Sequence, residues 1–341
     1  MKKKHVILII IVLLFAIVTV AFIVNRNKKN IINHPFTVSE VKVKITVKSG
    51  DTLDTVFDHL NNETLLKSKT VVDSFINKNG LSKTVVPGEY NISSSVSLDK
   101  LIHYLNKGIL DDTPVKVTIP EGYDIESIAK LLESKGIISK SEFLKSCKEY
   151  KLPDYVKEDS KRKYSLEGYL FPDTYEFYKG TSGKAIIDEM TTRFISIVNE
   201  IKSKTGKSIS NEELDKYITM ASIIEKEVKL NDERGKAASV FYNRLSKGMK
   251  LESCATVLYA MGVHKDKLSY NDLKVNSPYN TYIVSGLPEG PISCPGRSCI
   301  EAAISPPSTN YLYFVSKNDG SHYFTDNYKD FLSVKQVTQG N

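Results

Sequence analysis

One order of strand and helix signals occurs twice in the first half of this 341-residue chain, and it restricts the fold more than any other feature. In the first copy, residues 41–47 alternate as in a half-exposed strand, and residues 49–60 contain a turn followed by apolar residues at helical spacing. In the second copy, residues 115–119 alternate and residues 120–132 repeat the turn and helix. Each copy continues with a Ser/Lys turn, another short helix and a Gly-Tyr element. Two copies of a strand–helix–helix unit predict a small α/β domain, because solenoids need more repeats.

The first copy is similar to a LysM module over residues 44–92. It contains the opening Gly50-Asp-Thr-Leu53, and its predicted order is strand–helix–helix–strand. LysM modules bind glycans that contain N-acetylglucosamine, whereas a scaffold with the same compact architecture need not bind anything; the sequence leaves both readings open. We expect residues 41–110 to form a LysM-like unit and residues 111–160 a second repeat unit or connector.

The N-terminus carries an apolar run over residues 6–24 that only Thr19 interrupts. At about 1.5 Å per residue, a helix of this length crosses most of a bilayer core. The run ends without the small-residue pattern of a cleavage site, which predicts a signal anchor that stays attached. Positive charges flank both ends, so the positive-inside rule does not fix the orientation. We expect residues 1–30 to form a cytoplasmic tip and transmembrane anchor, and residues 31–40 a polar stalk.

Charge and cysteine usage exclude some kinds of function. Six of the seven excess positive charges fall in the first 30 residues, which leaves a net charge of +1 for the rest of the chain. A near-neutral body argues against a nucleic-acid partner. The sequence has no C-x-x-C pair and no clustered histidines, so no metal and no cofactor are expected. At least two of Cys254, Cys294 and Cys299 are expected to lie close enough for a disulfide.

Two glutamates, Glu225 and Glu227, border the apolar face of a helix predicted over residues 217–228. At roughly 100° per residue, the two side chains point about 160° apart, so they cannot act as one pair. A carboxyl group pressed against apolar side chains can keep its proton near neutral pH, as a general acid must. Each glutamate can equally be the structural partner of an arginine or a backbone N–H. Periodicity does not choose between the two residues.

Further elements are predicted in the C-terminal half. Residues 183–204 read as a helix, and residues 311–315 and 322–325 as the strands of a hairpin with an Asp-Gly turn. Residues 276–296 form a long loop rich in proline and glycine, a kind of segment that is often functional. The stretch Tyr279-Asn-Thr-Tyr282 offers hydroxyls, an amide and flat rings, which suit sugars and equally suit ordinary loop hydrogen bonds.

Several long motifs, in order and at matching spacing, resemble the endolytic murein transglycosylase (MltG, YceG-like) family. The resemblance extends from about residue 41 to about residue 335, and the N-terminal anchor agrees with it. It rests on the segments Glu167-Gly-Tyr-Leu-Phe-Pro-Asp-Thr-Tyr175, Ala221-Ser-Ile-Ile-Glu-Lys-Glu227, Ala238-Ser-Val-Phe-Tyr-Asn-Arg-Leu245, Tyr279-Asn-Thr-Tyr282, Gly286-Leu-Pro-Glu-Gly-Pro-Ile292 and Tyr311-Leu-Tyr-Phe-Val315. The expected fold is α+β: a transmembrane helix, the small LysM-like α/β domain, and an α+β catalytic domain over residues 161–341.

The resemblance implies a single-pass enzyme of the cell membrane whose catalytic domain is extracytoplasmic. It implies cleavage of the β-1,4 bond between N-acetylmuramic acid and N-acetylglucosamine in nascent peptidoglycan strands, with 1,6-anhydro ends as product. The first glutamate of the Glu-Lys-Glu triplet, Glu225, is implied as the sole general acid/base. Substrate-binding residues on the matched motifs are Glu167, Asn243, Arg244, Asn280 and Tyr282. The implied partners are peptidoglycan strands, the membrane and peptidoglycan synthases of the elongation machinery.

One segment departs from the family. The family tends to read L-Q-S-D-P-T-V where this chain has Leu251-Glu-Ser-Cys-Ala-Thr-Val257, which puts in doubt any binding role at position 254. Two alternatives to a transglycosylase stay open. One is a glycan hydrolase that uses Glu225 with Glu167 or another carboxylate. The other is a membrane-anchored protein that binds peptidoglycan without cutting it.

Overall fold

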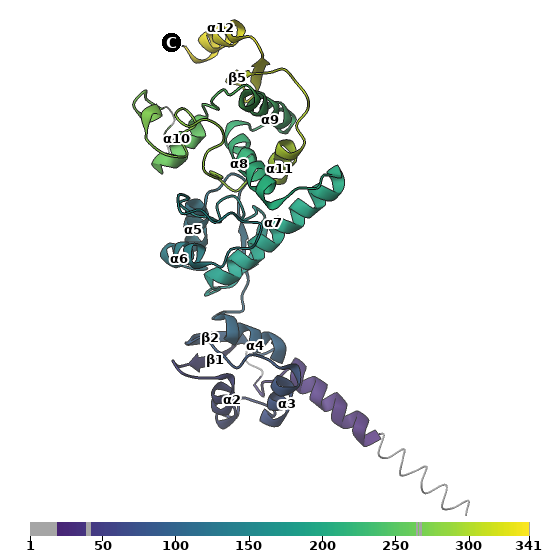
Figure 1. The fold of residues 1–341 in the computed structure, drawn as a ribbon. Coiled ribbons are helices and arrows are strands. Elements are labelled where there is room, and N and C mark those ends of the chain that lie inside the picture. The colour runs from purple at the N-terminus through teal and green to yellow at the C-terminus, as the bar shows by residue number, and fades with distance from the viewer. Residues whose placement is uncertain (1–18, 39–41, 264, 266–267, 341) are drawn as a thin grey trace, which may run out of the picture. The chain divides into compact units, whose positions relative to one another are not determined.

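The computed structural model describes residues 19–38, 42–263, 265 and 268–340, which fold into two compact units (Figure 1). The first unit comprises Met1–Val115 together with Phe177–Ser182. The second comprises Lys116–Glu176 and Gly183–Asn341. Both units mix helices with two-stranded sheets, so the expected α+β class is confirmed at this level.

The first unit has the predicted order of strand, helix, helix and strand. Strand β1 (Lys42–Val47) pairs antiparallel with β2 (Gly88–Ser93), with Ile45 opposite Tyr90. Between them lie α2 (Leu53–Asn62) and α3 (Lys69–Asn79), and α4 (Leu98–Lys107) follows β2. The order agrees with that of a LysM module, while the likeness to that module stays a prediction.

The sequence of this unit explains its local structure. Thr52 caps α2 and exchanges hydrogen bonds with Thr55, which closes a capping box at the helix start. Inward residues of both strands and one face of each helix form a continuous buried core. That core includes Val43, Ile45, Phe57, Ile76, Tyr90, Ile92, Leu101 and Leu105. Burial of this apolar surface holds the short sheet against its helices.

The second repeat is built into the second unit. Strand β3 (Val115–Thr118), α5 (Ile125–Ser134) and α6 (Lys140–Glu149) precede β4 (Thr174–Phe177), and β3 pairs with β4. The order again is strand–helix–helix–strand. The expected boundary near residue 160 does not separate the compact units, because β4 completes the sheet of β3 and α6 packs on α7.

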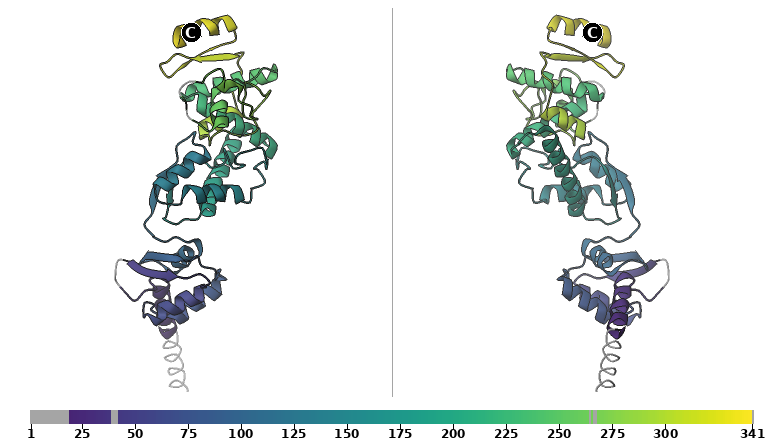
Figure 2. Two further views of the ribbon diagram at one scale, coloured as in Figure 1. Left: turned by 90° about the vertical axis from the view of Figure 1, so that its left-hand side faces the viewer. Right: turned by 90° about the vertical axis from the view of Figure 1, so that its right-hand side faces the viewer.

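The rest of the second unit is mainly helical. It contains α7 (Gly183–Thr205), α8 (Asn211–Glu227), α9 (Asn231–Ser246), α10 (Cys254–Met261), the 3₁₀ turn η1 (Asp272–Lys274) and α11 (Arg297–Ile304). Helices α8, α9 and α11 pack on one another. Strands β5 (Tyr313–Ser316) and β6 (His322–Thr325) form the predicted hairpin, and α12 (Tyr328–Gln339) packs on it (Figure 2).

The predicted membrane anchor at residues 6–24 lies mostly outside the described residues, which show a helix over 19–33. Within the described part of the chain, no helix combines the length and the apolar character needed to cross a membrane.

Candidate active site

The last turn of α8 sends its two glutamates into different surroundings, as their spacing predicted. Ser210 caps the start of this helix through a capping box with Glu213. At the other end, the Glu225 side chain meets α9 and the start of α11, and the Glu227 side chain meets the start of α10. Glu225 therefore lies in a structural position, and Glu227 lies in a position that faces a cleft.

Glu225 is held by a buried ion pair. One carboxylate oxygen lies 3.1 Å from a guanidinium nitrogen of Arg234, and the other accepts a 2.9 Å hydrogen bond from the Gly296 backbone N–H. The side chains of Glu225 and Arg234 are 6% and 8% exposed. Glu121, on the turn after β3, lies 3.6 Å from the same guanidinium, and burial together with the charge of Glu225 raises its pKa. This network ties α8 to α9, α11 and the β3 turn.

Glu227 lies at the N-terminus of α10. It accepts hydrogen bonds from the Ser253 hydroxyl and from the backbone N–H of Ala255. Burial of the carboxyl group raises its pKa, and the two hydrogen bonds and nearby His322 oppose this shift only in part. A carboxyl group that keeps its proton toward neutral pH is suited to act as a general acid.

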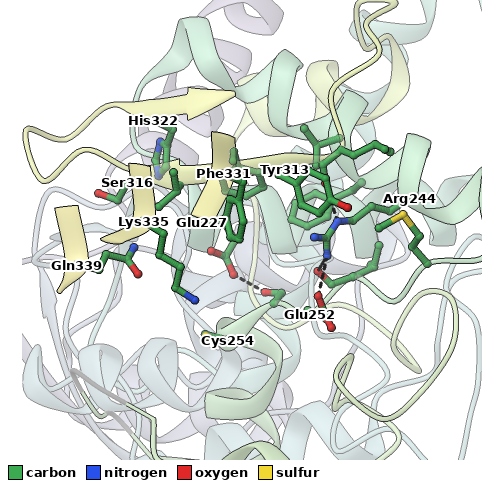
Figure 3. Close-up of a pocket in the computed structure, with 18 of the residues that line it drawn as sticks. Glu227, Arg244, Glu252, Cys254, Tyr313, Ser316, His322, Phe331, Lys335 and Gln339 are labelled. Carbon is green, nitrogen blue, oxygen red and sulfur yellow. Dashed lines mark hydrogen bonds and ion pairs between the residues drawn. The ribbon is translucent and has the colours of Figure 1, made fainter. Parts of the chain in front are cut away.

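Two cavities of the second unit meet at Glu227 and Cys254, which line both of them. The first cavity has a volume of about 900 Å³ and extends from Glu227 to the β5–β6 hairpin and α12 (Figure 3). The second has a volume of about 1050 Å³ and extends along α5 and α10. An elongated substrate that occupies both cavities would pass the Glu227 carboxyl group near its middle.

The expected catalytic role of Glu225 does not fit this geometry. Glu225 lines neither cavity, and both of its carboxylate oxygens are engaged within the protein. Helical periodicity made Glu225 and Glu227 equal candidates for the catalytic acid, and the family resemblance favoured Glu225. The packing of α8 favours the second, since Arg234 lies on the Glu225 side and the open space lies on the Glu227 side.

Two of the five predicted substrate contacts line the cleft. Arg244 donates to the carbonyl oxygens of Leu251 and Leu312 at 3.0 and 2.8 Å, and its guanidinium lies over the Tyr313 ring. Tyr282 places its hydroxyl 3.2 Å from the Cys254 sulfur, and burial raises the pKa of that phenol. Both residues belong to the wall of the first cavity.

The other three predicted contacts support the fold around the cleft and do not line either cavity. Asn243 donates to the carbonyl oxygens of residues 309 and 311 at 2.8 and 2.9 Å. Asn280 is fully buried and donates to the carbonyl oxygens of residues 273 and 275. Glu167 is 1% exposed and accepts hydrogen bonds from Ile125 N–H and the Tyr259 hydroxyl. Their polar groups hydrogen-bond backbone groups around the cleft, and the substrate contact predicted for these three residues stays a prediction.

Burial raises the pKa of Glu167 to about 8, and the charge of Asp124 adds to this shift. Glu167 therefore holds its proton toward neutral pH, and it is a second carboxyl group with a raised pKa in addition to Glu227. It lies behind the wall of the second cavity, which its partner Tyr259 lines. A raised pKa thus does not by itself identify the acid; access to the cleft separates Glu227 from Glu167.

The expected disulfide is not formed, because all four cysteines are free thiols. Cys254 is exposed in the cleft, and Cys294 is buried with its sulfur 3.9 Å from a carboxyl oxygen of Glu167. Cys299 is buried beside Glu225. Each thiol packs against a different polar partner. Position 254, where the sequence departs from the family, does face the cleft.

Sequence reasoning did not assign several cleft residues. Ser253, Tyr313 and His322 line the first cavity. Tyr313 lies within a matched motif, and Ser253 is one of the family residues retained beside Cys254. His322 gave no signal, since a single histidine in a predicted strand is compatible with many structural roles. Within the ranges that the structure describes, no group of three or more His, Cys, Asp or Glu side chains is placed to hold a metal ion.

A buried carboxyl group with a raised pKa, beside a long, polar and tyrosine-lined cleft, suits acid–base chemistry on an extended hydroxyl-rich polymer. The model of the YceG-like family matches residues 45–337, and the chain belongs to this family. The fold agrees with a crystal structure of a yceG-like protein from Listeria monocytogenes. The TM-score is 0.57 at 33% identity, over 87% of this chain and 100% of that one.

Curated relatives give the family an activity. The endolytic murein transglycosylase of Bacillus subtilis strain 168 is 36% identical over 311 residues, which cover 87% of this chain and 85% of the relative. The endolytic murein transglycosylase of Streptococcus pneumoniae serotype 2 strain D39 is 31% identical over 319 residues. That match covers 86% of this chain but only 57% of the pneumococcal protein, which is longer.

Proposed function

We propose that this protein is a lytic transglycosylase that cuts peptidoglycan glycan strands internally, with Glu227 as its general acid and base. The observation that carries the proposal is the position of Glu227 where the two cavities meet. The names of the curated relatives support the reaction class and the substrate. The shape of the cleft supports internal cleavage, since it continues on both sides of the carboxyl group.

The reaction needs one carboxyl group. Protonated Glu227 gives its proton to the bridging oxygen as the bond between this oxygen and the anomeric carbon of the muramic acid breaks. The C6 hydroxyl of the same sugar then forms a new bond to the anomeric carbon, and the Glu227 carboxylate takes the hydroxyl proton. The carboxyl group is restored, and the product ends in 1,6-anhydromuramic acid. Ser253 and the start of α10 stabilise the charged form of Glu227 between the two proton transfers.

A hydrolase would use a second carboxylate to activate water or to attack the sugar. Glu252 is the other carboxylate of the first cavity, and it lies 3.3 Å from a guanidinium nitrogen of Arg244 (Figure 3). Its carboxylate is engaged with the Arg244 guanidinium, and the proposal assigns it no role in proton transfer. It therefore provides a matched control in the same cavity.

Product analysis on uncrosslinked glycan strands tests the proposal. Wild-type protein should release 1,6-anhydromuramic ends, and Glu227→Gln should lower the rate about 10²–10⁴-fold, the usual cost of losing a general acid. Glu252→Gln should keep most of the rate. Ends that borohydride reduces would mean that water attacked and that the protein is a hydrolase. Binding of strands by folded wild-type protein without any cleavage would favour a glycan-binding protein.

We also propose that residues 6–24 anchor the protein in the cell membrane, with the chain after Arg26 outside the cell. The support is the length and apolar character of the run. Protease added to intact protoplasts should remove the body and leave an N-terminal fragment in the membrane. Full protection of the body would contradict the proposed orientation.

Two finer proposals concern partners. The first unit is proposed to bind the same glycan strands in the manner of a LysM module, because it has the strand–helix–helix–strand order. A position at the membrane would bring the enzyme close to peptidoglycan synthases of the elongation machinery. Crosslinking in cells should capture such a synthase. A variant whose anchor is replaced by an unrelated apolar helix is the control for specific contact.

A further inference from the structure

A histidine and a glutamate form a buried pair at the edge of the Glu227 cavity. His322, the first residue of β6, lines the cavity, and Glu233 lies in the first turn of α9. One carboxylate oxygen of Glu233 lies 2.7 Å from His322 Nδ1, and the other accepts a 3.0 Å hydrogen bond from the His322 backbone N–H. Their side chains are 11% and 8% exposed. The contact therefore joins the hairpin to α9.

The geometry fixes which ring nitrogen is available. A carboxylate at Nδ1 requires a hydrogen on that nitrogen, so in the neutral ring the lone pair is on Nε2. Phe314 packs edge-on against the imidazole, with the ring centroids 5.5 Å apart, and limits its rotation. Nε2 has no hydrogen-bond partner among the residues that the structure describes. Orientation of a histidine by a carboxylate at one nitrogen is a recurring way to present the other nitrogen to a substrate.

We infer that His322 contacts the glycan in the Glu227 cavity, with Nε2 accepting a hydrogen bond from a sugar hydroxyl and Glu233 serving as the positioning residue. The inference rests on the proposed function, which places a hydroxyl-rich strand in this cavity. The ring lines the same cavity as the Glu227 carboxyl group (Figure 3). The Nε2 lone pair of the neutral tautomer is an acceptor for hydroxyl groups, which are the most abundant donors of a glycan.

Two substitutions separate this role from a purely structural one. In His322→Asn, the side-chain amide reaches only the position of Nδ1, so it keeps the contact with Glu233 and loses the group that faces the cavity. In His322→Gln, the longer amide reaches the position of Nε2 and keeps an acceptor for the cavity. If His322 only holds the hairpin to α9, the Asn variant should keep cleavage closer to wild type than the Gln variant. If His322 contacts the glycan, the Gln variant should keep cleavage closer to wild type than the Asn variant.

Steady-state cleavage of glycan strands by the full-length variants tests the inference. We expect His322→Asn to raise KM about tenfold with kcat within about threefold of wild type, the range for one lost hydrogen bond, and His322→Gln to lie closer to wild type. Wild-type kinetics for His322→Asn would overturn the contact. So would a larger defect for Gln than for Asn. Melting temperatures of both variants show whether each one folds.

A measurement without a change at His322 covers the case in which a variant does not fold. In Glu227→Gln protein labelled with ¹⁵N-histidine, saturating glycan strands should shift the Nε2 resonance of His322. An unchanged resonance at saturation would overturn the inference. Failure of the proposed function has a different signature, since wild-type protein would then release no anhydro ends. In that case, the same resonance and equilibrium binding of strands still report whether His322 contacts a glycan.

Discussion

The buried pair of Glu225 and Arg234 gives the most direct test of the reassignment on α8. Replacement of Arg234 by Met keeps much of the apolar stem and removes the guanidinium. It would remove the guanidinium partner of the Glu225 carboxylate, which is 6% exposed and would keep the Gly296 N–H and the Cys299 thiol beside it. Loss of one partner of a buried ion pair typically costs about 3–5 kcal/mol. For a unit of this size each kcal/mol shifts the melting temperature by roughly 2–4 °C, so a decrease of roughly 6–20 °C is expected.

Thermal unfolding followed by circular dichroism at neutral pH measures this effect. Lys216→Met is the control, because Lys216 lies on α8 and pairs with Glu212 while both side chains are exposed. No measurable change is expected from it. The double variant Arg234→Met/Glu225→Gln should be more stable than Arg234→Met, since it no longer buries an unpaired charge. The argument fails if Arg234→Met melts with the Lys216→Met control, or if the double variant is no more stable than the single one.

Three further predictions follow from the cleft. Glu225→Gln should lower the melting temperature while the folded protein keeps cleavage within about tenfold of wild type, whereas Glu227→Gln should do the reverse; equal losses of rate would contradict the assignment. Because the pKa of Glu167 is raised to about 8, its contribution to stability is fully present below its usual pKa and is lost as pH rises through 8. Glu167→Gln should therefore flatten the fall in unfolding free energy between about pH 5 and about pH 9, and an unchanged slope would refute this. A bulky maleimide should block cleavage by reacting with Cys254, the one exposed thiol, and Cys254→Ala should be resistant; inhibition of that variant would point to another site.

The repeated strand–helix–helix pattern was sufficient to predict both copies of that unit. It relied on local information: alternation marked β1 and β3, helical spacing marked α2 and α5, and Thr52 and Ser139 cap helices where the turns were expected. The α7 helix and the β5–β6 hairpin were predicted for the same reason. The predicted division at residues 110/111 lies close to the observed one after Val115. The predicted division near residue 160 does not separate compact units, because the partner of β3 lies more than fifty residues further along the chain, in β4.

The candidate site was likewise predictable where it depends on local sequence and unpredictable where it depends on tertiary contacts. The sequence alone determined that two glutamates would leave the end of α8 in different directions, since that follows from the helical repeat. Only the tertiary structure decided which of them faces a cleft, because Arg234 comes from α9 and the cavity walls come from α5, α10 and the hairpin. Local periodicity depends only on residues that are neighbours in the sequence. Burial, charge partners and access to substrate depend on segments that meet only after the chain has folded.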